Sequence, residues 1–360
     1  MDTLQFDDGT KAFPGEGSKV ISRLRLYLIL PALCAIAYPS LLWLLSEFAS
    51  LLHVSTPLRG AAIGISVIVA LAAASGVMLV SFELGLVLSR PDSVSPDHHR
   101  ARILAHLAFA APSILVGFGN VAGVLDARAA VPIVWPIFWT LLAAAVLFAP
   151  KTSGSFTAMS PAARHRLGMA HGISACVIII LFIAPHIGNH LTGFRNGATH
   201  IAIMKAVRQL YRSEIVEPVL LTLIGFQILS GVALVRGRMR QRSDFFGTLQ
   251  TMTGVYVGIY FLAHMTAVFS ARHGGTDTDW NWLTSDGRGM LTRLSSISLV
   301  AHYWMGPIAI FIHIACGLRM VMLQNAVSPL LAGRVARALI GLGVVASSVI
   351  LVALLGVHFA

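Results

Sequence analysis

Apolar residues gather in long tracts that recur along the whole chain and are separated by short polar stretches. Each tract holds about 20 residues, the length of helix that crosses roughly 30 Å of hydrocarbon. Such tracts predict an all-α integral membrane protein, because helices satisfy their own backbone hydrogen bonds within lipid. About nine transmembrane helices are expected. Their predicted ranges are 26–47, 60–88, 102–124, 131–149, 170–192, 216–236, 249–270, 297–321 and 334–357.

The composition supports this fold class and excludes two functional classes. Hydrophobic residues make up 56% of the chain and charged residues only 11%, against about a quarter in soluble domains. The polar stretches between tracts reach roughly 30 residues at most, which is too short for a soluble catalytic domain. Lys and Arg outnumber Asp and Glu by 26 to 15. In a membrane protein this excess sets loop orientation, so we predict no nucleic-acid partner.

The distribution of basic residues predicts the orientation. With the N-terminus in the cytoplasm, 17 of the 26 Lys and Arg residues fall in cytoplasmic segments, as the positive-inside rule requires. We therefore expect a multi-pass protein of the cell (inner) membrane, with a cytoplasmic N-terminus and an external C-terminus. Of the two longest external loops, 193–215 and 271–296, the second carries Trp280 and Trp282, which suit anchoring at the lipid interface.

Histidines are the most informative polar residues. Seven of the 14 lie within or at the edge of predicted spans: His106, His171, His186, His190, His264, His302 and His313. His186 lies roughly 7 Å beyond the midpoint of the fifth span, and His264 lies roughly 6 Å beyond that of the seventh. Both displacements point outward. Two imidazoles at one depth on two helices suit a bis-histidine haem b, whose apolar porphyrin fits between helices.

Other uses of these histidines stay open. Each ring could simply form hydrogen bonds with a neighbouring carbonyl or hydroxyl, since polar groups in lipid need partners. Zinc prefers three or four close ligands, and the outer halves of these spans supply no acidic residue for it. His190 follows His186 by one helical turn and is the second choice of ligand there.

A second, inner haem lacks an evident second ligand. His302 and His313 lie 11 residues apart on one face of the eighth span, so this helix could hold two stacked haems. His302 is a second-choice ligand. At the depth of His313, however, the sixth span offers only Gln227, whose amide is a poor ligand for haem iron. We therefore expect loss of His313 to change haem content little.

Three motifs carry a resemblance to a known family. Leu249-Gln250-Thr251-Met252-Thr253-Gly254 is followed ten residues after the glycine by His264. The sequence His313-Ile314-Ala315-Cys316-Gly317-Leu318 has the pattern H-x-x-x-G-L, and His171 precedes His186 by 15 residues. Residues 165–360 thus resemble the single-chain, five-helix cytochrome b membrane anchor of succinate:quinone and fumarate:quinone oxidoreductases.

The resemblance implies roles for these residues. His264 and His186 correspond to the ligands of the outer haem, and His313 to a ligand of the inner haem. His171, with the nearby Arg166, corresponds to the region near the inner haem or a quinone. Gln227 replaces the histidine of the family pattern in the sixth span.

The hydropathy pattern and the resemblance together divide the chain into three parts. Residues 1–25 form a cytoplasmic tail, residues 26–150 a four-helix membrane region without a cofactor motif, and residues 165–360 a five-helix cytochrome b-like bundle.

The sequence therefore favours a b-type cytochrome that carries electrons between the quinone pool and another redox centre. It would serve as an electron-transfer subunit, with flavoprotein and iron–sulfur partners on other chains. One alternative is a haem-containing membrane sensor or anchor for a separate signalling enzyme. A third is a haem-free transporter that uses its intramembrane polar groups.

Overall fold

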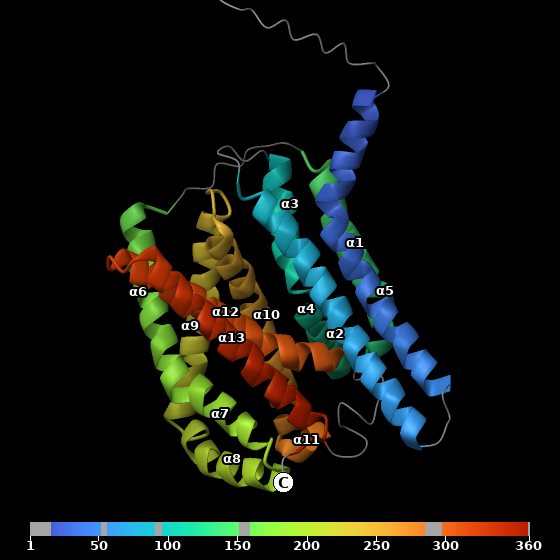
Figure 1. The fold of residues 1–360 in the computed structure, drawn as a ribbon, viewed down its shortest axis with the longest axis vertical. Helices are drawn as coiled ribbons and strands as arrows, with labels where there is room; N and C mark the ends of the chain where they lie inside the picture. The colour runs from blue at the N-terminus through green and yellow to red at the C-terminus, as the bar shows by residue number, and fades with distance from the viewer. Residues whose placement is uncertain (1–15, 52–55, 91–95, 151–158, 285–296, 359–360) are drawn as a thin grey trace, which may run out of the picture.

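Every secondary-structure element in the described part of the chain is a helix (Figure 1). The computed structural model describes residues 16–51, 56–90, 96–150, 159–284 and 297–358. The elements are α1 (Glu16–Leu51), α2 (Thr56–Val87), α3 (Pro96–Phe109), α4 (Ala111–Val124), η1 (Arg128–Ala130), α5 (Val131–Phe148), α6 (Pro161–Ile178), η2 (Ile179–Ile183), α7 (Ala184–Thr192), α8 (Gly197–Tyr211), α9 (Val216–Arg238), α10 (Phe245–His273), α11 (Trp280–Thr284), α12 (Ile297–Gln324) and α13 (Pro329–Leu354). Residues 1–15 of the predicted tail lie outside the described residues, and α1 begins ten residues before the predicted first span.

The long helices have the length and exterior of membrane spans. Among the described residues, eight helices are long and apolar enough to cross a bilayer, and the bent pair α3–α4 makes a ninth if counted as one span. Large apolar side chains cover the outside, with Ile180 70% and Leu229 74% exposed. So much exposed hydrocarbon is stable only against lipid. The protein is a multi-pass, all-α membrane protein.

The bend within the third span has a local cause. Helices α3 and α4 meet at Ala110 with an angle of 67° between them. Pro112 follows at the start of α4, where its missing N–H and its ring prevent continuation of the helix from α3.

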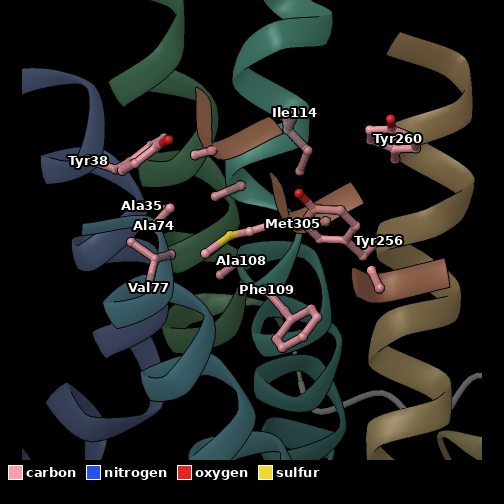
Figure 2. Packing of buried hydrophobic residues seen from close by; sticks show 14 of the residues in the cluster. Ala35, Tyr38, Ala74, Val77, Ala108, Phe109, Ile114, Tyr256, Tyr260 and Met305 are labelled. Atoms are coloured by element: carbon pink, nitrogen blue, oxygen red, sulfur yellow. The ribbon is translucent and has the colours of Figure 1, made fainter. Parts of the chain in front are cut away.

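The four N-terminal spans and the C-terminal spans share one core. Helices α3 and α4 pack along α10, and α2 packs against α12. Figure 2 shows this interior, where small residues such as Ala35, Ala74 and Ala108 let the helices approach closely around Met305 and Tyr256. The N-terminal region therefore forms one wall of the bundle.

The fifth span is longer than its hydropathy indicates. It begins at Pro161, where the Ser160 hydroxyl caps the helix by accepting a hydrogen bond from the Ala163 N–H. It then continues through the π-helical segment η2 into α7. Pro185 lies at the start of α7, and the N–H that it lacks accounts for the irregular turn just before it.

Helices α8 and α11 cover one end of the bundle, called here the α8 end (Figure 1). Trp280 of α11 is only 4% exposed and packs where the chain passes from α7 to α8. A Cβ atom at Gly193 would lie 2.3 Å from the Trp280 ring, and one at Gly197 would lie 2.6 Å from it. These two glycines leave the space for the indole. Trp280 therefore lies inside the protein and fastens α11 to α8.

Candidate functional site

The first histidine pair consists of His186 on α7 and His264 on α10. Their ring centres lie 6.3 Å apart, with the ring planes inclined by 76°. Two imidazoles that bind one metal ion from opposite sides place their ring centres roughly 6 Å apart. This follows because each metal–nitrogen bond is about 2 Å long and each ring centre lies about 1 Å behind its nitrogen. The pair therefore has the spacing of two axial ligands.

The irregular fifth span determines where His186 lies. A π-turn inserts one extra residue and so rotates every following side chain relative to a continuous α-helix. His186 is the first residue after Pro185, directly beyond this insertion. A regular helix from residue 161 to residue 192 would carry it on a different face.

Aromatic side chains enclose the first pair. The Phe182 ring stacks on His186 at 4.9 Å, and the Tyr260 ring stacks on His264 at 5.7 Å. Tyr303 of α12 meets His264 edge to face. The two histidines and Phe182 line a largely apolar cavity that extends to the α8 end. Flat aromatic walls beside two imidazoles suit a flat, apolar ligand such as a porphyrin.

Two further histidines continue from the first pair toward α8. The His190 ring lies 4.8 Å from that of His186 and 5.0 Å from that of His200. The Asn189 amide nitrogen lies 3.1 Å from His200 Nε2, so the ring accepts there and its Nδ1 carries the hydrogen. Among the described residues, Nδ1 of His190, His200 and His264 has no hydrogen-bond partner.

His200 lies on α8, outside the spans. Burial lowers its pKa to about 4, and the Arg208 guanidinium adds to this effect while the Asp279 carboxylate opposes it. The ring is therefore neutral at pH 7.

His302 is not part of either histidine pair. It is 1% exposed, and its Nδ1 lies 3.3 Å from the Ser113 hydroxyl of α4. Its neighbour in this interior is the ring of Tyr260, at 4.5 Å. The described residues contain no group of three or more His, Cys, Asp or Glu side chains arranged to hold a metal ion.

A second histidine pair, His171 on α6 and His313 on α12, has nearly the same geometry. Its ring centres lie 6.4 Å apart and its planes are inclined by 79°. Hydropathy did not bring these two residues together, because it placed the start of the fifth span at residue 170.

Hydrogen bonds fix the tautomer of both rings in the second pair. His313 Nδ1 lies 3.0 Å from the Gln250 carbonyl oxygen, which can only accept, so Nδ1 carries the hydrogen. His171 Nδ1 lies 2.8 Å from the Ser230 hydroxyl, which donates its one hydrogen to the Phe226 carbonyl. Ser230 must therefore accept from His171 Nδ1. Both Nε2 atoms keep a free lone pair, as metal-binding histidines do when the other nitrogen is held.

Two neighbouring residues explain how the second pair is accommodated. The Gln227 amide donates to the His171 carbonyl oxygen at 2.7 Å, so it joins α9 to α6. A Cβ atom at Gly254 would lie 2.9 Å from the His313 ring, so a glycine is needed for this ring to lie against α10.

The basic residue near the second pair differs from the one singled out in the sequence. Arg166 is exposed on the first turns of α6 and precedes His171 by five residues. Arg238 of α9 instead donates to the Gln250 side chain at 3.2 Å, beside the backbone carbonyl that holds His313. No motif marked Arg238, because it lies in a run of alternating arginines at the end of a span.

Compared with known protein families, characterised relatives and solved structures, the chain shows no match. The chemistry of the site is therefore inferred from its own residues and their geometry. In each of the two pairs, one histidine lies on the irregular fifth span and its partner lies on α10 or α12. Both pairs have the separation of axial ligands. Each pair offers two imidazole nitrogens in an apolar interior, which fits haem b.

Proposed function

We propose that the protein is a membrane b-type cytochrome that carries electrons between the quinone pool and another redox centre. The observation that carries this proposal is the 6.3 Å separation of the His186 and His264 rings between aromatic walls. His186 and His264 would hold the iron of one haem b. When bound, the haem supplies one-electron chemistry, while the protein fixes its position and its potential.

A second haem, held by His171 and His313, belongs to the same proposal. It is supported by the matching ring separation of 6.4 Å and by the two Nε2 lone pairs that the hydrogen bonds leave free. His171 thus takes the place of the ligand that Gln227 cannot supply. The two α6–α7 ligands are 15 residues apart along the span, so the sites lie at different depths.

The predicted orientation places these sites relative to the two compartments. With a cytoplasmic N-terminus, the first pair lies toward the outer face of the inner membrane and the second pair toward the cytoplasm. A cytochrome with two such sites suits electron exchange with a redox subunit on another chain, such as an iron–sulfur protein. Arg166, exposed at the cytoplasmic end of α6, is suited to contact a quinone oxygen or that subunit.

The experiment is a reduced-minus-oxidised spectrum of purified protein in proteoliposomes, followed by addition of a short-chain quinol. The proposal predicts b-type bands, reduction by the quinol, and turnover when an electron acceptor is supplied. Haem reduction without acceptor turnover would favour the sensor or anchor. A protein without haem bands would favour the transporter.

A further inference from the structure

Three arginines line the mouth of the cavity that holds the first histidine pair. Arg208 belongs to the last turn of α8, Arg212 directly follows that helix, and Arg272 belongs to the last turn of α10. The cavity thus joins two imidazoles at its apolar end to three guanidinium groups at the α8 end. An apolar ligand with an anionic edge would match both ends at once.

Two of the three guanidinium groups have carboxylate partners. Arg272 donates to both carboxylate oxygens of Glu217, at 2.5 and 3.4 Å. Arg208 pairs with Asp277 and also donates to the Thr278 carbonyl oxygen at 3.1 Å. These pairs hold the end of α10 to α9 and the end of α8 to the segment before α11. They give the mouth a fixed shape.

Arg212 differs from the other two. Its hydrogen bond to a described residue is a long one, 3.4 Å to the Thr278 hydroxyl, and none of the described carboxylates lies within ion-pair distance. Burial, followed by the charges of Arg208 and Arg272, lowers the pKa of Arg212. The same cavity is lined by Tyr211, whose buried hydroxyl has no partner among the described residues. Among the described residues, the mouth therefore holds one arginine without an ion-pair partner and one unused hydroxyl donor, and the Asp279 carboxylate also lines the cavity.

We propose that Arg212 and Tyr211, framed by the two ion pairs, bind the propionate carboxylates of the haem held by His186 and His264. This inference rests on the proposed function and deepens it, because it assigns the orientation of the porphyrin. The propionate edge faces the α8 end, and the apolar edge lies among the aromatic side chains deeper in the bundle. A guanidinium with free N–H groups is the side chain best suited to hold a carboxylate.

A porphyrin without charged propionates provides the test. The full-length protein, freed of haem in detergent, is titrated with haem b and with its dimethyl ester, and the Soret band reports binding. Arg212→Gln is expected to weaken binding of haem b about tenfold, as loss of one charge-assisted hydrogen bond does, and to leave binding of the ester unchanged. Tyr211→Phe should act in the same sense with a smaller factor.

Arg195→Gln is the matched control, because Arg195 is an exposed cation between α7 and α8 that does not line the cavity. It should bind both porphyrins as the unaltered protein does. The propionate assignment would be overturned if Arg212→Gln weakened the binding of haem b and of its ester equally. It would also be overturned if the variant weakened the binding of neither porphyrin. A protein in which no variant binds either porphyrin would instead overturn the proposed function. The two failures are thus distinct.

Discussion

The two histidine pairs share one geometry but differ in what surrounds them. The rings of His171 and His313 are held through Nδ1 by Ser230 and a backbone carbonyl, so their orientation is fixed by the protein alone. In the first pair, His264 Nδ1 has no partner within the described part of the chain, and His186 and His264 border a cavity with further nitrogen atoms that lack partners there. The second pair is therefore preorganised, while the first pair needs its ligand to complete it. We expect the first site to respond more to ligand, pH and salt.

The largest expected effects come from removing the proposed haem ligands. His264→Ala and His186→Ala should each abolish haem at the first site, because the remaining imidazole supplies only one strong bond to iron. His171→Ala and His313→Ala should each empty the second site. Each variant is expected to halve the haem content, measured as pyridine haemochrome per chain. His302→Ala, which alters a buried histidine outside both pairs, should retain both haems.

If His190→Ala rather than His186→Ala empties the first site, the ligand lies one turn further along α7. If His313→Ala keeps the full haem content, the second pair is structural, and the sequence-based expectation for His313 holds.

The next largest effect concerns pH and the α8 end. His200 binds its proton in the unfolded chain near pH 6.5 and in the folded protein only near pH 4. The unfolded state therefore takes up more protons between these values, and stability falls as the pH drops from about 6.5 to about 4. The loss is at most about 3 kcal/mol. His200→Gln should flatten this dependence.

Thermal melting, followed at the Soret bands of both sites, checks this expectation. As the pH falls, the first site should lose its haem at a lower temperature. The temperature at which the second site loses its haem should depend less on pH. A pH dependence that is identical in His200→Gln would show that another group controls it.

The sequence predicted the fold class well, because twenty-residue apolar tracts have one structural solution in lipid. It also singled out His186 and His264, but by an argument from depth that assumed straight spans with hydropathic boundaries. The fifth span begins nine residues before residue 170, since Arg164, His165 and Arg166 are polar yet helical. This moves its midpoint toward His171 and away from His186. The depth of a histidine, estimated from the hydropathic ends of its span, therefore cannot decide which imidazole rings lie together.

The remaining features depend on tertiary structure. Figure 1 shows α12 and α13 crossing the bundle obliquely, and this tilt helps to bring His313 to α6. The π-turn before Pro185 and the slot between Gly193 and Gly197 for Trp280 depend on packing between distant segments. A hydropathy pattern carries no information about such packing. In the sequence, the arginines of the cavity mouth appear only as basic residues of the external loops. Their position at one cavity follows from the packing of α8 and α10.

A smaller effect is expected from the hydrogen bond that orients His171. Ser230→Ala removes the acceptor of its Nδ1 hydrogen, which makes the imidazole a weaker donor to iron and should raise the midpoint potential of the second haem by a few tens of millivolts. A redox titration should show this shift in one haem and none in the other. Equal shifts in both would contradict the assignment of His171 to the second site.

The smallest effect is expected at Gln227. Gln227→Leu removes its bond to the His171 carbonyl and should cost about 1–2 kcal/mol of stability while both haems remain. Chemical denaturation of the purified protein measures the first quantity, and haem content measures the second. Loss of the second haem in this variant would mean that Gln227 does more than join α9 to α6.

The central claim is that four histidines on three spans hold two iron porphyrins. It is tested most directly by the ratio of haem b to polypeptide in protein purified after expression with added haem precursor. The account predicts two haems per chain, with b-type absorption and the spectra of low-spin, bis-imidazole iron. A full yield of protein that contains one haem per chain, or none, would contradict it.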